Sequence, residues 1–591
     1  MHVTFLYPDV FCKTWHHYQY GIASLSACLK QAGHTTDLIH LDEVTTKEWF
    51  LKELERRGTE VLAVSATSGQ WRYVRGPLKW TAEELPKIHR IAGGIHPTLV
   101  PGDIFASAPL DAIFLGEAEH SLPEYIGKLA QGAPPLDVAG TWANVGGRVR
   151  GGSIGGGEIR KNPPARLPDP LDQLPLADHD LFDFRDILRR TGGEASLMAT
   201  RGCPYRCSYC SNEVRIDQNK GLGDNMRYRA AKMVFDEVAH VQGAYGAQSV
   251  YFIDDIFTMN RQWLRGFCEE YGRRGGPPFK IQIQVKTVDY ERLAMMREVG
   301  LYQIVVGVES GDDRVRKKIL NKSITQDDIA RVFRDADSLG IETAAYNMIG
   351  IPGETEESIR NSIEFNKKIA PDRTILSIFT PFPGTSLYEE CLRLGLLEDY
   401  TKATYFDKAS FLPIPGISRE KLEALYDEYT RSGIEISEKK ARRGYFDFLT
   451  ALDQARVRTQ DSRFVYLAAP RIDSVERKSV SCHPFSELSY GVRLKSGTKL
   501  KFGIGMAPEV WSPEKGEGVT FRVEVKSGLR RKKLFERHLD PKRNPRDRHW
   551  ANHELDLSAF GSKKVNLLFS THVERSNDFC SSYWAEPHLV G

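Results

Sequence analysis

The chain has 591 residues, of which 41% are hydrophobic and 27% charged, and its formal net charge is only +3. This length predicts roughly three or four domains, and the small net charge argues against a dedicated nucleic-acid or polyanion binder. No apolar run reaches the roughly eighteen residues of a membrane span, and the first residues lack a signal-peptide pattern, so we expect a cytoplasmic protein.

Residues 1–135 alternate between strand and helix signals. "HVTFLYP", "TTDLIHL" and "VLAVSAT" are short apolar runs, whereas "GIASLSACLKQAGH" has helical spacing and ends in a glycine. This alternation predicts a doubly wound parallel sheet, which binds ligands at the carboxyl ends of its strands. The candidate ligand loops are "SATSGQ" (65–70), "GGIHPT" (93–98) and "LGEAEH" (115–120).

Residues 136–193 are rich in Gly and Pro, which predicts a connector with room for one hairpin. Residues 194–415 then contain six strand signals with helical stretches between them, a pattern that predicts a partial (β/α)6 barrel. Chemistry in such a barrel lies where the strands end. The strand ends here carry Cys203, Asp254, Asp255, Glu309 and Gly350.

Residues 416–460 are expected to form a helical linker, and residues 461–591 an all-β sandwich of the jelly-roll type. Trp511, Trp550 and Trp584 could form a sugar-binding platform, but aromatic residues in strands are more often core. The basic run at 529–538 could touch anionic lipid headgroups, although a solvated face is the more common reading. Contact with a carbohydrate or a membrane surface therefore stays open.

The stretch "RGCPYRCSYC" (201–210) holds three of the nine cysteines, Cys203, Cys207 and Cys210. The other six are scattered, as expected for a reducing compartment. Closed zinc sites use four protein ligands, so zinc fits three thiolates poorly. In a 4Fe-4S cluster, three cysteines would leave one iron open to another ligand. Free loop thiols or an incomplete zinc knuckle are the alternatives.

The C-x3-C-x2-C spacing after a strand of a β/α barrel resembles the radical S-adenosylmethionine superfamily. The resemblance implies that S-adenosylmethionine chelates the open iron and is cleaved to a 5'-deoxyadenosyl radical, which takes hydrogen from an unactivated carbon. It also implies an electron donor such as flavodoxin or ferredoxin.

The resemblance also suggests roles for single residues. Tyr209 would pack near the adenine, and in "GVESG" (307–311) Glu309 and Ser310 would face the ribose or the methionine part. A helix cap is the ordinary alternative for such a carboxylate.

Two further strand ends match the family pattern. In "NMIGIPGET" (347–355) the backbone at Gly350 would meet the adenine, unless this is an ordinary strand-to-helix turn. In "FIDDIF" (252–257) we expect one of Asp254 and Asp255 to face the active site and the other to serve the structure.

The N-terminal domain resembles the cobalamin-binding domain of one subfamily, through "YPDV", "YGIASLSACLKQAGH", "GGIHPT" and "FLGEAEHSLPEYI". The Asp-x-His-x-x-Gly loop of stand-alone corrinoid proteins is absent, but this subfamily generally holds cobalamin without it. A corrinoid needs small residues and hydroxyl groups at strand ends. The alternative is a domain that has lost its cofactor. The residues expected on the cobalamin side are Ser65, Thr67, Gly93, Gly94 and His96.

The resulting hypothesis is a cobalamin-dependent radical S-adenosylmethionine enzyme, in first place a methyltransferase acting on an unactivated carbon of a small-molecule or lipid-like substrate. The alternative is a radical carbon-carbon bond former or cyclase on a lipid, isoprenoid or tetrapyrrole. A remote alternative is a non-catalytic cobalamin sensor or docking protein, but three clustered thiols, which oxidise readily, argue against it.

Overall fold

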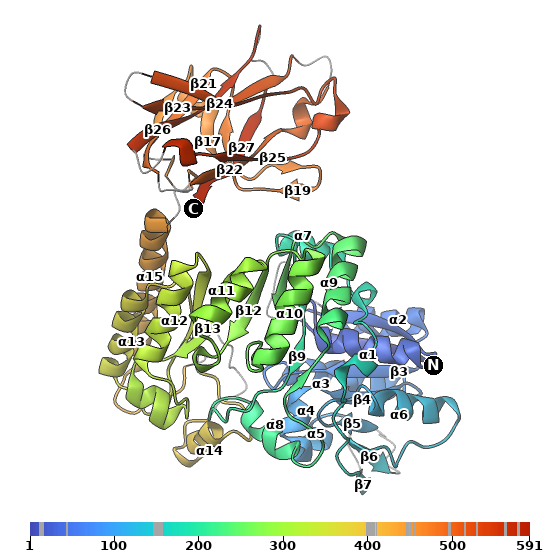
Figure 1. The fold of residues 1–591 in the computed structure, drawn as a ribbon. Helices are drawn as coiled ribbons and strands as arrows, with labels where there is room; N and C mark the ends of the chain where they lie inside the picture. The colour runs from blue at the N-terminus through green and yellow to red at the C-terminus, as the bar shows by residue number, and fades with distance from the viewer. Residues whose placement is uncertain are drawn as a thin grey trace. The chain divides into compact units, whose positions relative to one another are not determined.

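A computed structural model describes the chain except for residues 11–16, 43–44, 146–157, 398–407, 409–410, 445–447, 450, 453–454, 495–497, 513–515, 528–529, 561–563, 576–579 and 591. The described residues form two compact units, Met1–Ile434 and Glu435–Gly591, each with its own hydrophobic clusters (Figure 1). Among the helices described, none combines the length and apolar character that crossing a membrane requires.

The first unit begins with a sheet in the order β2-β1-β3-β4-β5-β6-β7, in which β1 to β5 are parallel. The order 2-1-3-4-5 is that of flavodoxin-like sheets, which bind ligands at the carboxyl edge near the β1/β3 switch point. The strands are β1 His2–Pro8, β2 Thr35–Leu41, β3 Val61–Ser65, β4 His89–Gly93, β5 Ala112–Phe114, β6 Thr141–Val145 and β7 Glu158–Lys161.

Helices cover both faces of this sheet, because alternate residues of each strand point to opposite sides. Val3 and Phe5 of β1 pack with α1 and α6, whereas Leu6 packs with α2 and α3. The predicted doubly wound architecture is therefore confirmed. The helices are α1 Tyr20–Gln31, α2 Lys47–Arg57, α3 Trp71–Glu84, α4 Ile95–Leu99, α5 Pro101–Ser107 and α6 Ser121–Ala130.

The Gly- and Pro-rich segment from residue 136 contains a hairpin, formed by β6 and β7. Because β6 pairs antiparallel with β5, this hairpin extends the N-terminal sheet. The helix α7, Phe184–Arg190, then leads into the second sheet.

The second sheet has six parallel strands in the order β15-β14-β13-β12-β11-β8, with β8 and β15 at its edges. It is therefore an open barrel of β/α units, as predicted. The strands are β8 Glu194–Leu197, β11 Ser249–Phe252, β12 Phe279–Ile283, β13 Leu301–Glu309, β14 Glu342–Ile349 and β15 Arg373–Ile378. The helices are α9 Ala231–Tyr245, α10 Arg261–Arg274, α11 Tyr290–Glu298, α12 Gln326–Ser338, α13 Glu356–Ile369 and α14 Ser386–Arg393.

The helix α15, Arg419–Gly444, spans the boundary between the two units. The second unit contains two five-stranded antiparallel sheets, in the orders β16-β21-β26-β23-β24 and β17-β20-β27-β22-β25, and a small hairpin of β18 and β19. One buried cluster takes residues from both large sheets, which confirms the all-β expectation.

Two of the tryptophans in this unit belong to its core. Trp584 is fully buried and Trp550 nearly so. These two side chains therefore do not form an exposed platform for a sugar.

The strands of this unit are β16 Arg456–Arg458, β17 Val465–Ala468, β18 Arg471–Ile472, β19 Val475–Glu476, β20 Ser479–Cys482, β21 Ser486–Arg493, β22 Lys499–Met506, β23 Val519–Ser527, β24 Arg530–Leu539, β25 Ala551–Asp556, β26 Lys564–His572 and β27 Ser582–Val590.

A buried carboxyl group holds the turn after β14. Glu354 is 2% exposed, and its Oε2 accepts hydrogen bonds from the backbone N–H groups of Gly350 and Ile351, both at 2.8 Å. Burial raises the pKa of Glu354 to about 8, because the charged form loses water, although the two hydrogen bonds oppose this shift. The turn is thus held by a side chain that is largely neutral at neutral pH.

We expect this group to make stability depend on pH. The pKa of Glu354 in the folded protein, about 8, lies above the ordinary 4.5. Its contribution to the free energy of unfolding is therefore complete below about pH 4.5 and is lost as the pH rises through about 8. Glu354→Gln stays neutral. Between pH 6 and pH 9 the free energy of unfolding should therefore fall by at least about 1 kcal/mol more in the wild type than in the variant. Urea unfolding at both pH values measures the difference.

The matched control is Glu356→Gln, two residues further on. The Glu356 side chain is 42% exposed and pairs with Arg360, so its removal should leave the wild-type pH dependence above pH 6 intact. Equal pH slopes in the wild type and in Glu354→Gln would contradict the assignment.

Candidate active site

The three clustered cysteines lie on a loop at the carboxyl end of β8. The loop runs from β9, Thr200–Arg201, to β10, Arg227–Tyr228, and includes α8, Asn212–Gln218. Cys203, Cys207 and Cys210 are half-buried and free of disulfide bonds, and the N–H of Cys210 donates to the carbonyl of Cys207 at 3.0 Å. A tight turn therefore joins Cys207 to Cys210, and Cys203 lies four residues before it on the same loop.

The thiols are protonated when no metal is bound. Burial, together with the smaller effect of the charge on Asp255, raises the pKa of Cys203 to about 12 and that of Cys210 to about 11. Metal binding must therefore displace protons from the loop.

Among the described residues, no three His, Cys, Asp or Glu side chains are arranged to hold one metal ion. A cubane cluster is less demanding in this respect, because each thiolate binds a different iron.

Backbone contacts from distant segments support this loop. The N–H of Ser208 donates to the carbonyl of Leu320 at 3.1 Å, and the side chain of Asn321 donates to the carbonyl of Arg206 at 2.7 Å. At the start of the loop, Gly202 has a φ of +95°, and a Cβ there would lie 1.7 Å from the carbonyl oxygen of Asn225. Only glycine fits this position.

Tyr209 and Glu309, predicted from separate motifs, lie together. The Tyr209 hydroxyl donates to Oε1 of Glu309 at 3.0 Å, and Nζ of Lys322 lies 2.8 Å from the same oxygen. Glu309 ends β13 with a φ of +63°, a conformation that costs a non-glycine residue free energy and often marks functional sites. The sequence gave no signal for Lys322, which reaches the site only through the fold.

The structure does not bring Ser310 to this cluster. Ser310 is fully buried, and its hydroxyl lies 3.0 Å from that of Ser362 on α13. Gly350 has a φ of +84°, and a Cβ there would lie 2.9 Å from the ring of Phe411. Its N–H is held by Glu354, so the backbone of this turn is fixed.

The adjacent aspartates take different places. Asp254 is 1% exposed and accepts hydrogen bonds from the N–H groups of Ala199, at 3.1 Å, and Thr200, so it holds the chain that enters the cysteine loop. Burial raises the pKa of Asp254 to about 7. Asp255 instead lines the cavity beside the loop.

A cavity of about 280 Å³ lies between the carboxyl ends of the two parallel sheets. The N-terminal sheet contributes strand ends and loops, and the barrel contributes Met198, Thr200, Gly202, Ile253 and Asp255. Part of the lining is apolar, namely Phe5, Leu25, Ile91, Phe114 and Leu122. The remainder includes the charged side chains of Glu117, Glu119, Arg201 and Arg215.

Three of the residues expected on the cobalamin side line this cavity: Ser65, Gly93 and Gly94. Gly94 has a φ of +92°, and a Cβ there would lie 3.0 Å from the backbone N and O of Ala66. The close approach of these two strand ends therefore requires a residue without a side chain.

The other two, Thr67 and His96, are not among the lining residues. The carbonyl of Thr67 accepts from the N–H of Trp71 at the start of α3. The ring of His96 packs 5.2 Å from that of Trp71, and its Nδ1 lies 3.1 Å from the hydroxyl of Ser68. Burial lowers the pKa of His96 to about 4, so the ring is neutral.

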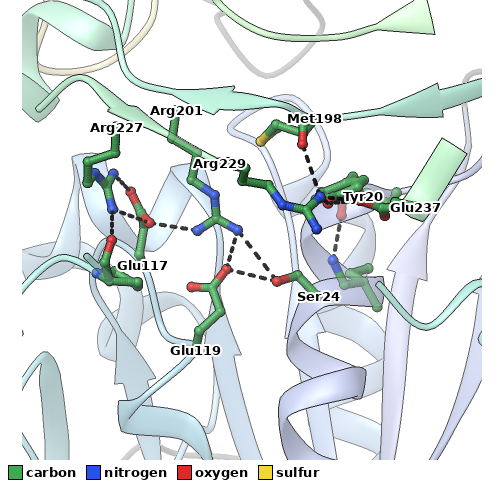
Figure 2. A network of polar contacts seen from close by, with 12 residues as sticks. Tyr20, Ser24, Glu117, Glu119, Met198, Arg201, Arg227, Arg229 and Glu237 are labelled. Carbon is green, nitrogen blue, oxygen red and sulfur yellow. Dashed lines mark hydrogen bonds and ion pairs between the residues drawn. The ribbon is translucent and has the colours of Figure 1, made fainter. Parts of the chain in front are cut away.

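Figure 2 shows a network of buried charges beside the cavity, in which two glutamates of the loop after β5 meet arginines of the barrel. Glu117 accepts from Arg201 at 2.7 Å and from Arg227, and Glu119 lies 2.7 Å from Arg201. Burial alone would raise the pKa of Glu117, but the hydrogen bond of Arg227 and the charges of both arginines hold it at about 2. The sequence predicts the loop at 115–120 as a candidate ligand loop but gives no sign that its glutamates pair with these arginines.

A second part of the network lies deeper. Arg229 donates to Glu237 and, at 3.3 Å, to the hydroxyl of Tyr20, which itself donates to Glu237 at 3.2 Å. Glu237 is 1% exposed, so these partners take the place of water around its carboxylate.

Family models match both parts of the first unit. The model of the radical SAM superfamily matches residues 197–365, and that of the B12 binding domain matches residues 14–126. The first range includes the cysteine loop, and the second includes the strand ends that line the cavity.

Several known proteins are similar over the first unit. An uncharacterised methyltransferase of Pyrococcus horikoshii is 24% identical over 379 residues, which are 64% of this chain and 79% of that protein. The anaerobic magnesium-protoporphyrin IX monomethyl ester cyclase of Cereibacter sphaeroides is 27% identical, over 65% of this chain and 62% of its own length. The hopanoid C-3 methylase of Methylococcus capsulatus is 24% identical, over 64% of this chain and 70% of its own length.

Solved structures show the same fold. The radical S-adenosylmethionine methyltransferase TsrM from Kitasatospora setae superposes with a TM-score of 0.54 and 18% identity, over 67% of this chain and 77% of its own. The cobalamin-dependent S-adenosylmethionine radical enzyme OxsB superposes with a TM-score of 0.50 and 18% identity, over 68% of this chain and 56% of its own. Residues 14–126 are thus a B12-binding domain and residues 197–365 a radical S-adenosylmethionine domain, joined in one chain.

Proposed function

We propose that the protein uses a 4Fe-4S cluster, S-adenosylmethionine and cobalamin to methylate an unactivated carbon of a small-molecule or lipid-like substrate. The observation that carries the proposal is the shared cavity, which is lined both by strand ends of the B12-binding domain and by the start of the cysteine loop. The cavity thus adjoins the base of the cysteine loop, through Arg201 and Gly202, while the three cysteines themselves are not among its lining residues. Similarity to proteins named methyltransferase or methylase supports methyl transfer.

Cys203, Cys207 and Cys210 would hold the cluster, which supplies one electron to S-adenosylmethionine when both are bound. The residues fit this task, because the thiols are free and grouped on one supported loop. An electron donor such as flavodoxin or ferredoxin would reduce the site. The scattered positions of the cysteines outside the loop are typical of a reducing compartment, so we propose a cytoplasmic location.

Glu309 is the residue best placed to orient S-adenosylmethionine. Tyr209 and Lys322 both reach its Oε1, which leaves Oε2 as the oxygen that would accept from a ribose hydroxyl. Lys322 places a positive charge 2.8 Å from this carboxylate and so helps to hold it in place. The side chain of Ser310 is turned toward α13, so its part would be limited to the backbone.

Cobalamin would carry the methyl group, and Ser65, Gly93 and Gly94 would line its site. The residues fit a flat cofactor with amide arms, since strand ends without bulk lie beside apolar and aromatic side chains. No histidine is among the residues that line the cavity, in agreement with a corrinoid held without a histidine ligand. The apolar residues would also keep water from a reactive carbon.

Ring formation without methyl transfer is the second candidate, and the similarity to the magnesium-protoporphyrin ester cyclase favours it. To separate the two, the reconstituted protein is incubated without oxygen with methyl-labelled S-adenosylmethionine, hydroxocobalamin and host extract. We expect label in an organic product. Formation of 5'-deoxyadenosine without transfer of label would favour the ring-forming reaction instead.

We expect Cys207→Ala to abolish cluster assembly and cleavage of S-adenosylmethionine, because two thiolates cannot hold the cubane. Iron and sulfide content and 5'-deoxyadenosine measure the effect. Cys268→Ala, at a buried cysteine of α10, is the control and should keep both. If Cys207→Ala forms 5'-deoxyadenosine at the wild-type rate, the assignment of this cysteine to the cluster is refuted.

We expect Leu25→Trp to weaken hydroxocobalamin binding at least about tenfold, because the larger side chain of α1 would fill the cavity, while cluster content stays unchanged. Absorbance titration measures the affinity. Leu129→Trp is the matched control, since Leu129 is also half-buried against the same core but does not line the cavity. Equal affinities in the two variants would speak against cobalamin in this cavity.

A further inference from the structure

The cysteine loop begins and ends on one short antiparallel ladder. Arg201 of β9 and Arg227 of β10 are direct partners across this ladder, and the three cysteines lie between them in the chain. Two residues per strand give little stability of their own. The base of the loop therefore depends on side chains that hold the two strands together.

One carboxylate from the B12-binding domain contacts both ends of the loop. Oε2 of Glu117 accepts from Nη1 of Arg201 at 2.7 Å and from Nη1 of Arg227 at 3.1 Å. The three side chains are 11%, 13% and 2% exposed for Glu117, Arg201 and Arg227, so water cannot replace the bonds if one group is lost. The two guanidinium groups, which repel each other, are held side by side by the charge between them (Figure 2).

The barrel holds the same base from its own side. Asp254 accepts from the backbone N–H groups of Ala199 and Thr200, just before Arg201. Glu119 adds a second carboxylate, but it lies beside Arg201 alone and is backed by the hydroxyl of Ser24 at 3.0 Å. Glu117 thus differs from Glu119 in joining the entry of the loop to its exit.

We propose that Glu117 is a positioning residue for the iron-sulfur cluster, through which the B12-binding domain fixes the geometry of the cysteine loop. The inference rests on the cluster site of the proposed function. Without the negative charge, Arg201 and Arg227 would repel each other across the ladder, and the loop would open at its base. The cluster would then be more accessible to solvent and less symmetrically held.

The test compares reconstituted wild-type protein with Glu117→Gln, which keeps the shape of the side chain and removes its charge. Two properties are measured: the rate of iron release to a ferrous chelator, and the electron paramagnetic resonance spectrum of the reduced cluster with and without S-adenosylmethionine. We expect iron release to become about tenfold faster and the spectrum to change, as for other residues that support metal ligands. Glu119→Gln should give a smaller effect.

Glu237→Gln is the matched control, because Glu237 also pairs with an arginine, Arg229, that lies outside the loop, and is more deeply buried than Glu117, with side chains 1% and 11% exposed. Thermal unfolding of both variants reports any general loss of stability. We expect Glu237→Gln to lower the midpoint while its iron release and spectrum stay near the wild type. Equal rates of iron release in the two variants, or a wild-type rate in Glu117→Gln, would overturn the inference.

The outcome is distinguishable from failure of the proposed function, because neither readout requires methyl transfer. If the wild-type protein releases iron slowly but transfers no label, methylation is contradicted, whereas the proposed positioning role of Glu117 is not. A wild-type protein that assembles no cluster would contradict both.

Discussion

Opposite charges buried between two parallel sheets are the interaction on which the first unit depends. Both sheets end their strands at a shared cavity, and polar chain ends of this kind cannot pack as an ordinary apolar core. Glu117 and Glu119 supply negative charge from the loop after β5, and Arg201 and Arg227 supply positive charge from the short ladder at the base of the cysteine loop. Because opposite charges are paired in this network, the two strand edges can face each other across the cavity without leaving a buried charge unpartnered.

The same constraint explains why the cysteine loop is so heavily supported. Three half-buried thiols are neutral without metal and give the loop no internal cohesion, so its shape has to come from outside. Asp254 and Gly202 fix its start, and the segment around Leu320 and Asn321 supports its middle. Much of this support comes from residues far away in the sequence, which makes the cluster site a product of the whole barrel and of the domain before it.

The sequence predicts those features of the fold and of the site that leave a local pattern in the chain. The cysteine spacing and the alternation of strands and helices predicted the open barrel and the doubly wound sheet, and the fold confirms both. Ser65 and Gly93 were found because small residues at strand ends are visible in the chain itself. The pairing of Lys322 with Glu309 and that of Arg227 with Glu117 were not found. The partners are 13 and 110 residues apart in the chain, and ion pairs at such separations leave no periodic pattern in the sequence.

The sequence by itself thus determined the chemistry and the fold classes available: three thiols, a doubly wound sheet, an open β/α barrel and an all-β second unit. Only the tertiary structure decided which groups meet. It placed Tyr209 against Glu309, turned the hydroxyl of Ser310 toward α13, and set Asp254 in the interior with Asp255 at the cavity. The physical reason is that residue type and spacing fix local conformation, whereas the direction of a side chain at a strand end depends on the packing of neighbouring strands and helices.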